Sequence, residues 1–316
     1  MGRKPMRPSA PIPKYAHVFR AGHPASPRCS LLEYSRYSRS SRLAIRAPRS
    51  GLPSPHFGIG ALSAALLAAW LIAAPVTAQE RPALIAAAAD LKFALAEIAS
   101  AFTRETGHVV RITYGSSGDL ARQIEQGAPF EMLMSADESY VEYLAGKGLT
   151  RDAGVCYAMG RLALFASRAS PLRVDPDFRD LRAAAADGRI TRFAIANPEH
   201  APYGRAARDV LQKLSLWDRL QPALVLGENA SQAMQFAASG SCQGGIVPLS
   251  LSIAPEVAAL GVFERIPAEW HAPLRQRMVL VKRAGPVAVA FFDYVHRSVS
   301  VRTTLARFGY ARPDGR

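Results

Sequence analysis

ALIAAAADLKFALAEIASAFTRETGHVVRITYGSSG, residues 83–118, holds two strand–helix junctions in succession. The apolar run 83–88 predicts a buried strand, and residues 91–104 place apolar side chains at helical spacing. Residues 109–114 are β-branched and aromatic, which predicts a second strand, and a short helix is expected over 120–126. The stretch therefore predicts βαβ units around a parallel sheet.

The same alternation continues to the carboxyl-terminal end. Further strands are expected at 131–135, 161–166, 193–196, 224–226, 245–247 and 278–281, and further helices at 179–186, 204–214, 230–239 and 286–295. The fold class is accordingly α/β, with mainly parallel sheets. Such sheets bind ligands beyond the carboxyl ends of their strands, where helices begin.

The basic residues are concentrated before this region. The 316-residue chain has a formal net charge of +14, and residues 1–78 carry +10 of it, with Glu33 as their one acid. The rest is nearly balanced, so the charge does not indicate nucleic-acid binding. Residues 1–58 are rich in Ser, Arg and Pro, and we interpret them as a disordered leader or as the product of a mis-set start.

Residues 59–78 have the pattern of a signal-peptide core and cleavage site. Residues 59–74 are uncharged and apolar, Pro75 ends the run, and Val76-Thr77-Ala78 offers small residues to a signal peptidase. A membrane anchor is the alternative, but a spanning helix needs about 20 apolar residues. We expect cleavage after Ala78 and a periplasmic protein that begins at Gln79.

Two cysteines, Cys156 and Cys242, follow the leader. In an exported protein they can pair. Two small buried thiols are an equal alternative, and the sequence gives no distance between them.

The two first strands both end in small or hydroxyl residues. Ala88-Ala89-Asp90 follows the first strand and Gly115-Ser116-Ser117-Gly118 follows the second, each directly before a helix. Backbone N–H groups and the helix dipole at such positions bind anions without a cation, although ordinary helix capping uses the same residue types.

The chain lacks the GxSxG, HExxH and CxxC motifs. His200 and His271 stand isolated in the sequence, and Asp137 and Glu138 are expected to start a helix. We therefore expect neither an enzyme nor a cofactor, and no site for a free metal cation.

Several motifs together carry a resemblance over residues 84–310. GSSG at 115–118, ARQIEQGAP at 121–129, SADE at 135–138 and NPEHAPYG at 197–204 are similar to the molybdate-binding proteins of bacterial ABC transporters, which are periplasmic solute-binding proteins. The resemblance implies a bilobal periplasmic-binding-protein fold in which two βαβ domains, joined by two crossover segments, close over one anion. Lobe one is expected over 79–160 plus 247–316 and lobe two over 161–246, with crossovers near 160–167 and 245–248.

The resemblance also implies the ligand and its binding residues. The ligand is molybdate, with tungstate, sulfate or another oxyanion as alternatives, and the partner is an ABC permease in the membrane; we expect a monomer that binds no nucleic acid. By motif position the oxyanion falls to Asp90, Ser117, Tyr203 and Ala230, with Ala89 and Ser116 as further candidates. A secreted enzyme that uses the interlobe cleft and a signalling module that docks on a membrane sensor are the readings from other classes.

Two positions depart from the family pattern. Asp90 stands where the family usually has Ser or Asn, and we expect its side chain to cap its helix or pair with Lys92 while its N–H binds the ligand. Pro248 stands where the family often has a tyrosine donor, so that hydrogen bond has to come from elsewhere, with Tyr203 as a candidate.

Overall fold

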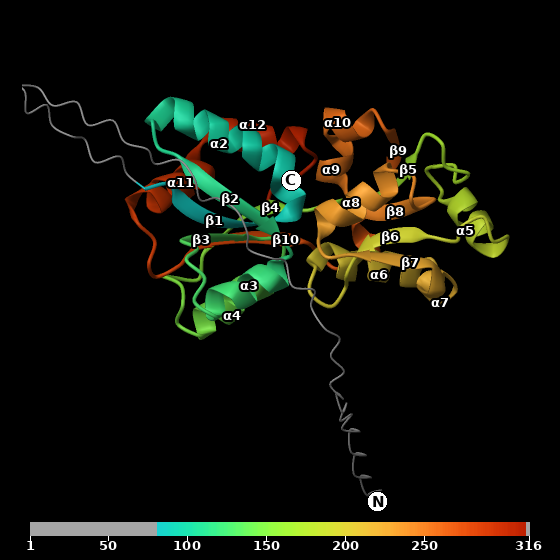
Figure 1. Ribbon diagram of the computed structural model, residues 1–316, viewed down its shortest axis with the longest axis horizontal. Helices are drawn as coiled ribbons and strands as arrows, with labels where there is room; N and C mark the ends of the chain where they lie inside the picture. The colour runs from blue at the N-terminus through green and yellow to red at the C-terminus, as the bar shows by residue number, and fades with distance from the viewer. Residues whose placement is uncertain (1–80, 314–316) are drawn as a thin grey trace, which may run out of the picture. The chain divides into compact units, whose positions relative to one another are not determined.

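The structure, a computed structural model, describes residues 81–313, so the predicted leader, signal peptide and cleavage site lie outside the described residues. Two five-stranded sheets form two lobes, each with flanking helices (Figure 1). The predicted α/β bilobal fold is thereby confirmed. The strands of the first sheet are β1 (Ala83–Ala88), β2 (Val110–Gly115), β3 (Met132–Ser135), β4 (Val155–Met159) and β10 (Arg275–Leu280). Those of the second are β5 (Leu162–Ser167), β6 (Phe193–Ala196), β7 (Leu224–Gly227), β8 (Gly244–Pro248) and β9 (Gly261–Arg265).

Both sheets are mixed rather than mainly parallel. The first has the order β2-β1-β3-β10-β4, in which β1 pairs in parallel with β2 and β3 while β10 runs antiparallel to β3 and β4. The second has the order β7-β6-β8-β5-β9, in which β6 pairs in parallel with β7 and β8 while β5 runs antiparallel to β8 and β9. Each antiparallel strand, β10 or β5, is the one that enters its sheet from the other lobe.

The chain changes sheets twice, at residues 160–161 between β4 and β5 and at residues 266–274 between β9 and β10. The first position agrees with the sequence expectation, whereas the second lies well beyond the expected 245–248. The lobe boundary at 247 is corrected for the same reason, because β9 still pairs with β5 in the second sheet. The two crossovers contact each other, since the Gly160 N–H donates to the Leu274 carbonyl over 2.8 Å.

Helices cover both faces of the first sheet. Figure 1 shows α2 and α12 on one side and α3 and α4 on the other. The helices of this lobe are the 3-10 turn η1 (Ala89–Leu91), α2 (Lys92–Thr106), α3 (Ser117–Glu125), α4 (Glu138–Gly146), α11 (Pro286–Arg297) and α12 (Val299–Arg307). Buried aromatic side chains pack these helices against one another, as where Phe102 of α2 meets Phe291 of α11 edge to face at 5.0 Å.

The second lobe has more, shorter helices. They are α5 (Arg179–Ala186), α6 (Pro202–Lys213), α7 (Trp217–Leu220), α8 (Ala230–Ala238), α9 (Leu249–Ile253) and α10 (Pro255–Ala258), with 3-10 turns η2 (Gln221–Ala223) and η3 (Ala268–Trp270). Both α6 and α8 pack on β6 and β8, and α8 and α9 also contact η1 of the first lobe. None of the helices within residues 81–313 combines the length and apolar character needed to span a membrane.

The two cysteines are separate thiols. Cys156 lies half-buried in β4 of the first sheet, and Cys242 lies buried before β8 of the second. No disulfide joins them in this structure, which favours the alternative of two unpaired thiols.

Candidate functional site

A small cavity lies where the two lobes meet, at the carboxyl ends of β1 and β2 on one side and at the starts of α6 and α8 on the other. Its volume is about 10 Å³. The residues that line it are Ala88, Ala89, Asp90, Gly115, Ser116, Ser117, Ala136, Ala201, Pro202, Tyr203 and Ala230. All six candidates from the sequence are among them, and none of the lining residues is a lysine or an arginine.

Helix starts give the cavity its chemical character. Ser117 is the first residue of α3, Ala230 the first of α8 and Tyr203 the second of α6. The first N–H groups of a helix have no acceptor within the helix, and in residues 81–313 these three have no other acceptor either. Three helix N-termini with unused donors therefore meet at one point, together with the start of η1, which favours an anion there.

Ser117 is held in place by the strand next to it. Its hydroxyl oxygen, which is fully buried, accepts a hydrogen bond from the Ala136 N–H over 2.9 Å. Because a hydroxyl has one proton to donate, this contact leaves the Ser117 proton available toward the cavity. Ser117 therefore offers two donors, the O–H and the N–H.

Ser116 serves the helix rather than the cavity. Its hydroxyl oxygen accepts from the Asp119 N–H over 3.2 Å as the N-cap of α3, and its proton goes to the Asp119 carboxylate over 2.6 Å. The side chain is thus occupied, although the residue lines the cavity.

Asp90 lies differently from its expected position. Its carboxylate neither caps a helix nor pairs with Lys92, so both expectations for this side chain are wrong. Instead, Asp90 Oδ2 accepts hydrogen bonds from Tyr203 Oη at 3.0 Å, Gln276 Nε2 at 2.6 Å and Tyr310 Oη at 2.7 Å. The residue is 1% exposed, and its three donors come from α6, β10 and the segment after α12.

Tyr203 is committed to the same network. Its hydroxyl donates to Asp90 and accepts from Gln276 Nε2 over 3.1 Å. A phenol has a single proton, so Tyr203 faces the cavity with its backbone N–H as the unused donor. Tyr157 completes the network by donating to Gln276 Oε1 over 2.8 Å.

The network is buried, and burial shifts the pKa values of its members. Burial raises the pKa of Asp90, while the hydrogen bonds from Gln276, Tyr310 and Tyr203 act in the opposite direction. Burial also raises the pKa values of Tyr157, Tyr203 and Tyr310 well above the ordinary tyrosine value, so these phenols stay neutral.

Pro248 ends β8 close to the cavity without lining it. Two residues further on, Ser250 donates its hydroxyl to the Asp90 carbonyl over 2.9 Å. Ser231 of α8 does the same to the Ala89 carbonyl over 2.8 Å. These side chains hold η1 from the second lobe and do not replace a donor to the cavity.

Contacts between the lobes surround the cavity. The Gly118 N–H donates to the His200 carbonyl over 3.1 Å. Arg205 of α6 forms an ion pair with Asp137 and donates to Tyr140 Oη over 2.9 Å. The lobes are thus closed around the cavity, as a hinge-type binding protein is when its ligand site is assembled.

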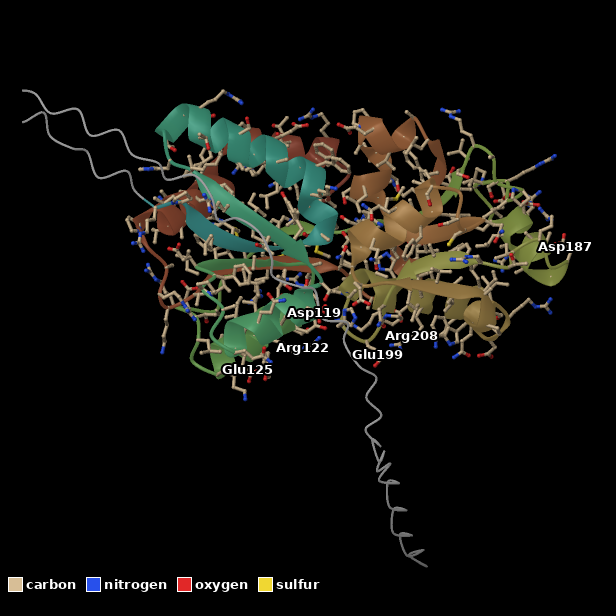
Figure 2. The ribbon with its side chains drawn as sticks, viewed as in Figure 1. Asp119, Arg122, Glu125, Asp187, Glu199 and Arg208 are labelled. Atoms are coloured by element: carbon tan, nitrogen blue, oxygen red, sulfur yellow. The ribbon has the colours of Figure 1, made fainter. Side chains whose placement is uncertain are left out.

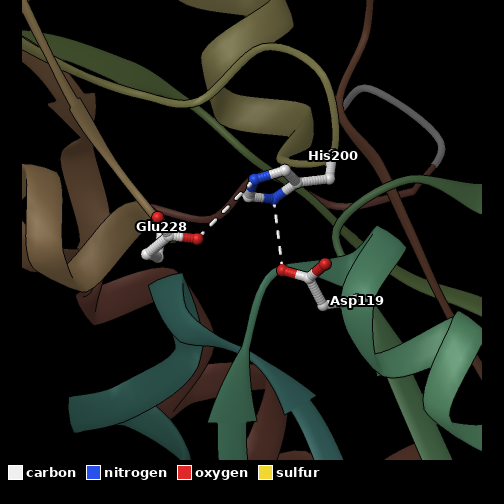
Figure 3. A group of neighbouring side chains, drawn as sticks. All are labelled: Asp119, His200 and Glu228. Atoms are coloured by element: carbon white, nitrogen blue, oxygen red, sulfur yellow. Dashed lines mark ion pairs between the residues drawn. The ribbon is translucent and has the colours of Figure 1, made fainter. Parts of the chain in front are cut away.

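His200 of the second lobe contacts the first lobe at Ser116, a residue that lines the cavity. Figure 3 shows His200 between Asp119 and Glu228, with Nδ1 3.2 Å from Asp119 and Nε2 3.9 Å from Glu228. The three residues are close enough to suggest metal ligands. However, the two carboxylates face different ring nitrogens, so the group has the form of two ion pairs.

Figure 2 shows Asp119, Arg122 and Glu125 along α3, with Glu199 on the facing lobe.

Gln276, Tyr310 and Tyr157 were missed by sequence reasoning. They lie 67 to 220 positions from Asp90 along the chain, and none follows a strand end or a helix start of the first lobe. The one signal in the sequence is the carboxylate at position 90, where the family usually has Ser or Asn. A buried carboxylate needs hydrogen-bond donors, so its presence implies that such partners exist.

The chain is similar to known solute-binding proteins in sequence and in fold. Residues 83–311 match the family model described as bacterial extracellular solute-binding protein. The molybdate-binding protein ModA of Rhodobacter capsulatus is 35% identical over 76% of this chain and 91% of its own length. The ModA of Azotobacter vinelandii is 34% identical over 80% of this chain and 98% of its own length. Among solved structures, the Azotobacter vinelandii periplasmic molybdate-binding protein is 31% identical, covers 73% of this chain and 99% of its own, and superimposes with a TM-score of 0.67.

Proposed function

The chain belongs to the family of bacterial extracellular solute-binding proteins, and from that premise we propose that it captures molybdate in the periplasm and delivers it to an ABC permease. The observation that carries the proposal is the closed interlobe cavity with its converging helix starts. A dianion removed from water needs donors for its oxygens. The cavity offers such donors without a lysine or arginine, which would hold the ion more firmly than release to a permease allows.

We assign the oxyanion to the candidates as follows. Ser117 contributes its hydroxyl and its N–H, and Tyr203 and Ala230 contribute N–H groups at the starts of α6 and α8. Ala89 and Asp90, at the start of η1, are the further residues assigned to the oxyanion. Ser116 keeps its role as a cap, because its hydroxyl is already occupied. No reaction is assigned to the cleft, and the protein is proposed to act as a monomer.

Several relatives support the choice of molybdate by name, and the helix starts around the cavity support an anion. Tungstate has nearly the size and shape of molybdate, so we expect it to bind as well. Sulfate is smaller and would span the donors of both lobes less well. Phosphate carries a proton of its own that needs an acceptor, whereas most of the cavity groups are donors.

Titration calorimetry of the chain from Gln79 onward tests the proposal, with molybdate, tungstate, sulfate and phosphate as separate titrants. We expect one molybdate or tungstate per chain and markedly weaker heats with sulfate and phosphate. The proposal is overturned if sulfate or phosphate binds more tightly than molybdate, or if none of the four binds.

A further inference from the structure

Asp90 is a buried carboxyl group at the wall of a proposed anion site. Its side chain is 1% exposed and the residue lines the cavity. No lysine, arginine or histidine within residues 81–313 forms an ion pair with it. A buried charge without an opposite charge is costly, and a dianion in the same cavity adds repulsion.

The two oxygens of this carboxyl group are in unlike surroundings. Oδ2 accepts from Tyr203, Gln276 and Tyr310, whereas Oδ1 is buried and has no hydrogen-bond partner among the described residues. Three donors on Oδ2 leave no room for a proton there. A proton on this side chain therefore belongs on Oδ1. An Oδ1–H group is a hydrogen-bond donor that has no acceptor among the described residues.

We propose that Asp90 holds the oxyanion as a neutral carboxylic acid, with its Oδ1 proton donated to an anion oxygen, so that capture of each dianion takes up one proton. This inference rests on the proposed function of the site and states which protonation state of Asp90 binds the anion. When the lobes are open, water reaches the Asp90 carboxyl and it ionises. When they close on the anion, one proton moves from solvent to Oδ1, and opening returns it.

The neighbours of Asp90 fit this assignment. Tyr203 of α6, Tyr310 near the carboxyl-terminal end and Tyr157 of β4 are neutral phenols, and Gln276 of β10 is a neutral amide. Burial raises the pKa of Asp90, in the direction that the proposal needs.

The arginines on β10 and α6, two of the elements that supply donors to Asp90, form ion pairs with other carboxylates. On β10, Arg275 and Arg277 pair with Glu138, and on α6, Arg205 pairs with Asp137. Lys92, which follows η1, lies over the Phe93 ring. His200 contacts Ser116 and Asp119 rather than Asp90.

Proton uptake is measured directly by titrating molybdate into the wild-type protein in buffers of different ionisation enthalpy, at several values from about pH 6 to about pH 8. Molybdate itself is the free dianion over this range. We expect close to one proton taken up per molybdate near the upper end of the range. The affinity should fall with rising pH, at a limiting slope of about tenfold per pH unit.

Two variants locate the proton. Asp90→Asn keeps the shape of the neutral acid, so its binding should be independent of pH, without proton uptake, and at pH 8 at least as tight as that of the wild type. His200→Gln removes the other candidate and should keep both the uptake and the slope. Circular dichroism checks that each variant is folded, and the wild-type measurement stands on its own.

The outcomes separate the two claims. Molybdate binding by the wild type without proton uptake overturns this inference and leaves the proposed function intact. Uptake that persists in Asp90→Asn, or that disappears in His200→Gln, also overturns it by placing the proton elsewhere. If the wild type binds no molybdate at any pH, the proposed function itself has failed.

Discussion

The Ser117 hydroxyl oxygen accepts a hydrogen bond from the Ala136 backbone N–H over 2.9 Å, and both residues line the interlobe cavity. The contact orients the hydroxyl so that its proton is available for a bound anion. The cavity therefore has a donor whose direction is fixed before the ligand arrives, which reduces the entropy lost on binding.

Replacement of Ser117 by alanine is expected to weaken molybdate binding. The variant loses one hydrogen bond to a charged group, worth about 1.5–3 kcal/mol, which corresponds to an affinity lower by roughly 10- to 100-fold. Ser252→Ala is the matched control, because Ser252 is also fully buried but donates to the Pro248 carbonyl over 3.1 Å. Calorimetry on both variants should show the loss in Ser117→Ala alone; equal losses would remove Ser117 from the site.

Gly160→Ala tests the crossover beside the Asp90 network. A Cβ on Gly160 would overlap the Tyr203 hydroxyl and lie 3.1 Å from Gln276 Nε2. Overpacking of this kind costs about 1–3 kcal/mol, and we expect it to hinder closure and to lower the molybdate affinity about tenfold. Gly146→Ala places its Cβ in open space at the end of α4 and should leave affinity unchanged. An unchanged affinity in Gly160→Ala would mean that this crossover does not limit closure.

The ion pair between Arg205 and Asp137 joins the lobes only when they are closed. Arg205→Gln should therefore shift the equilibrium toward the open form and lower the apparent affinity by a few-fold, since partly exposed pairs contribute about 0.2–1 kcal/mol. Arg189→Gln breaks a pair with Asp180 that lies within the second lobe, at 2.8 Å, and should leave affinity unaffected. A double-mutant cycle with Asp137→Asn should show coupling between Arg205 and Asp137. Absence of coupling would mean that this ion pair does not stabilise the closed form.

The cysteines give a prediction about reactivity. Burial raises the pKa values of Cys156 and Cys242, so less of each thiol is in the reactive thiolate form at neutral pH. Alkylation of the folded protein should therefore be slow at pH 7 and accelerate as pH rises past the ordinary thiol range, with buried Cys242 slower than Cys156. Two thiols should titrate in the unfolded, unreduced protein, and fewer than two would reveal a disulfide.

Export gives a prediction outside the described residues. The apolar run 59–74 and the Val76-Thr77-Ala78 site favour cleavage after Ala78. Amino-terminal sequencing of the protein from a periplasmic fraction should begin at Gln79. A retained apolar run would indicate a membrane anchor instead.

Much of the fold could be predicted because its inner strands are apolar runs. β1 and β6 occupy their expected positions, residues 83–88 and 193–196, and are almost wholly buried. β9 was not predicted, because Gly261–Arg265 is an edge strand whose burial is partial and whose residues include two charges. The second crossover was consequently placed too early, since the strand that precedes it had not been recognised.

The candidate residues came from two sources. Ser117 was proposed from the loop that follows the second strand, whereas Tyr203 and Ala230 followed from the resemblance. The structure places all three at helix starts that line the cavity. The fate of the Asp90 side chain was not predictable, because its partner Tyr310 lies 220 positions away. Contacts at such separation follow from tertiary packing and leave no periodic pattern in the sequence.

The central claim, that a molybdate ion binds between the lobes, is tested most directly by a crystal structure of the protein grown with molybdate and measured at the molybdenum absorption edge. We predict one strong anomalous peak in the cavity. The oxygens of the molybdate ion at that peak should accept hydrogen bonds from Ser117 and from the N–H groups of Tyr203 and Ala230. A peak on the outer surface, or a closed cavity without one, would contradict the account.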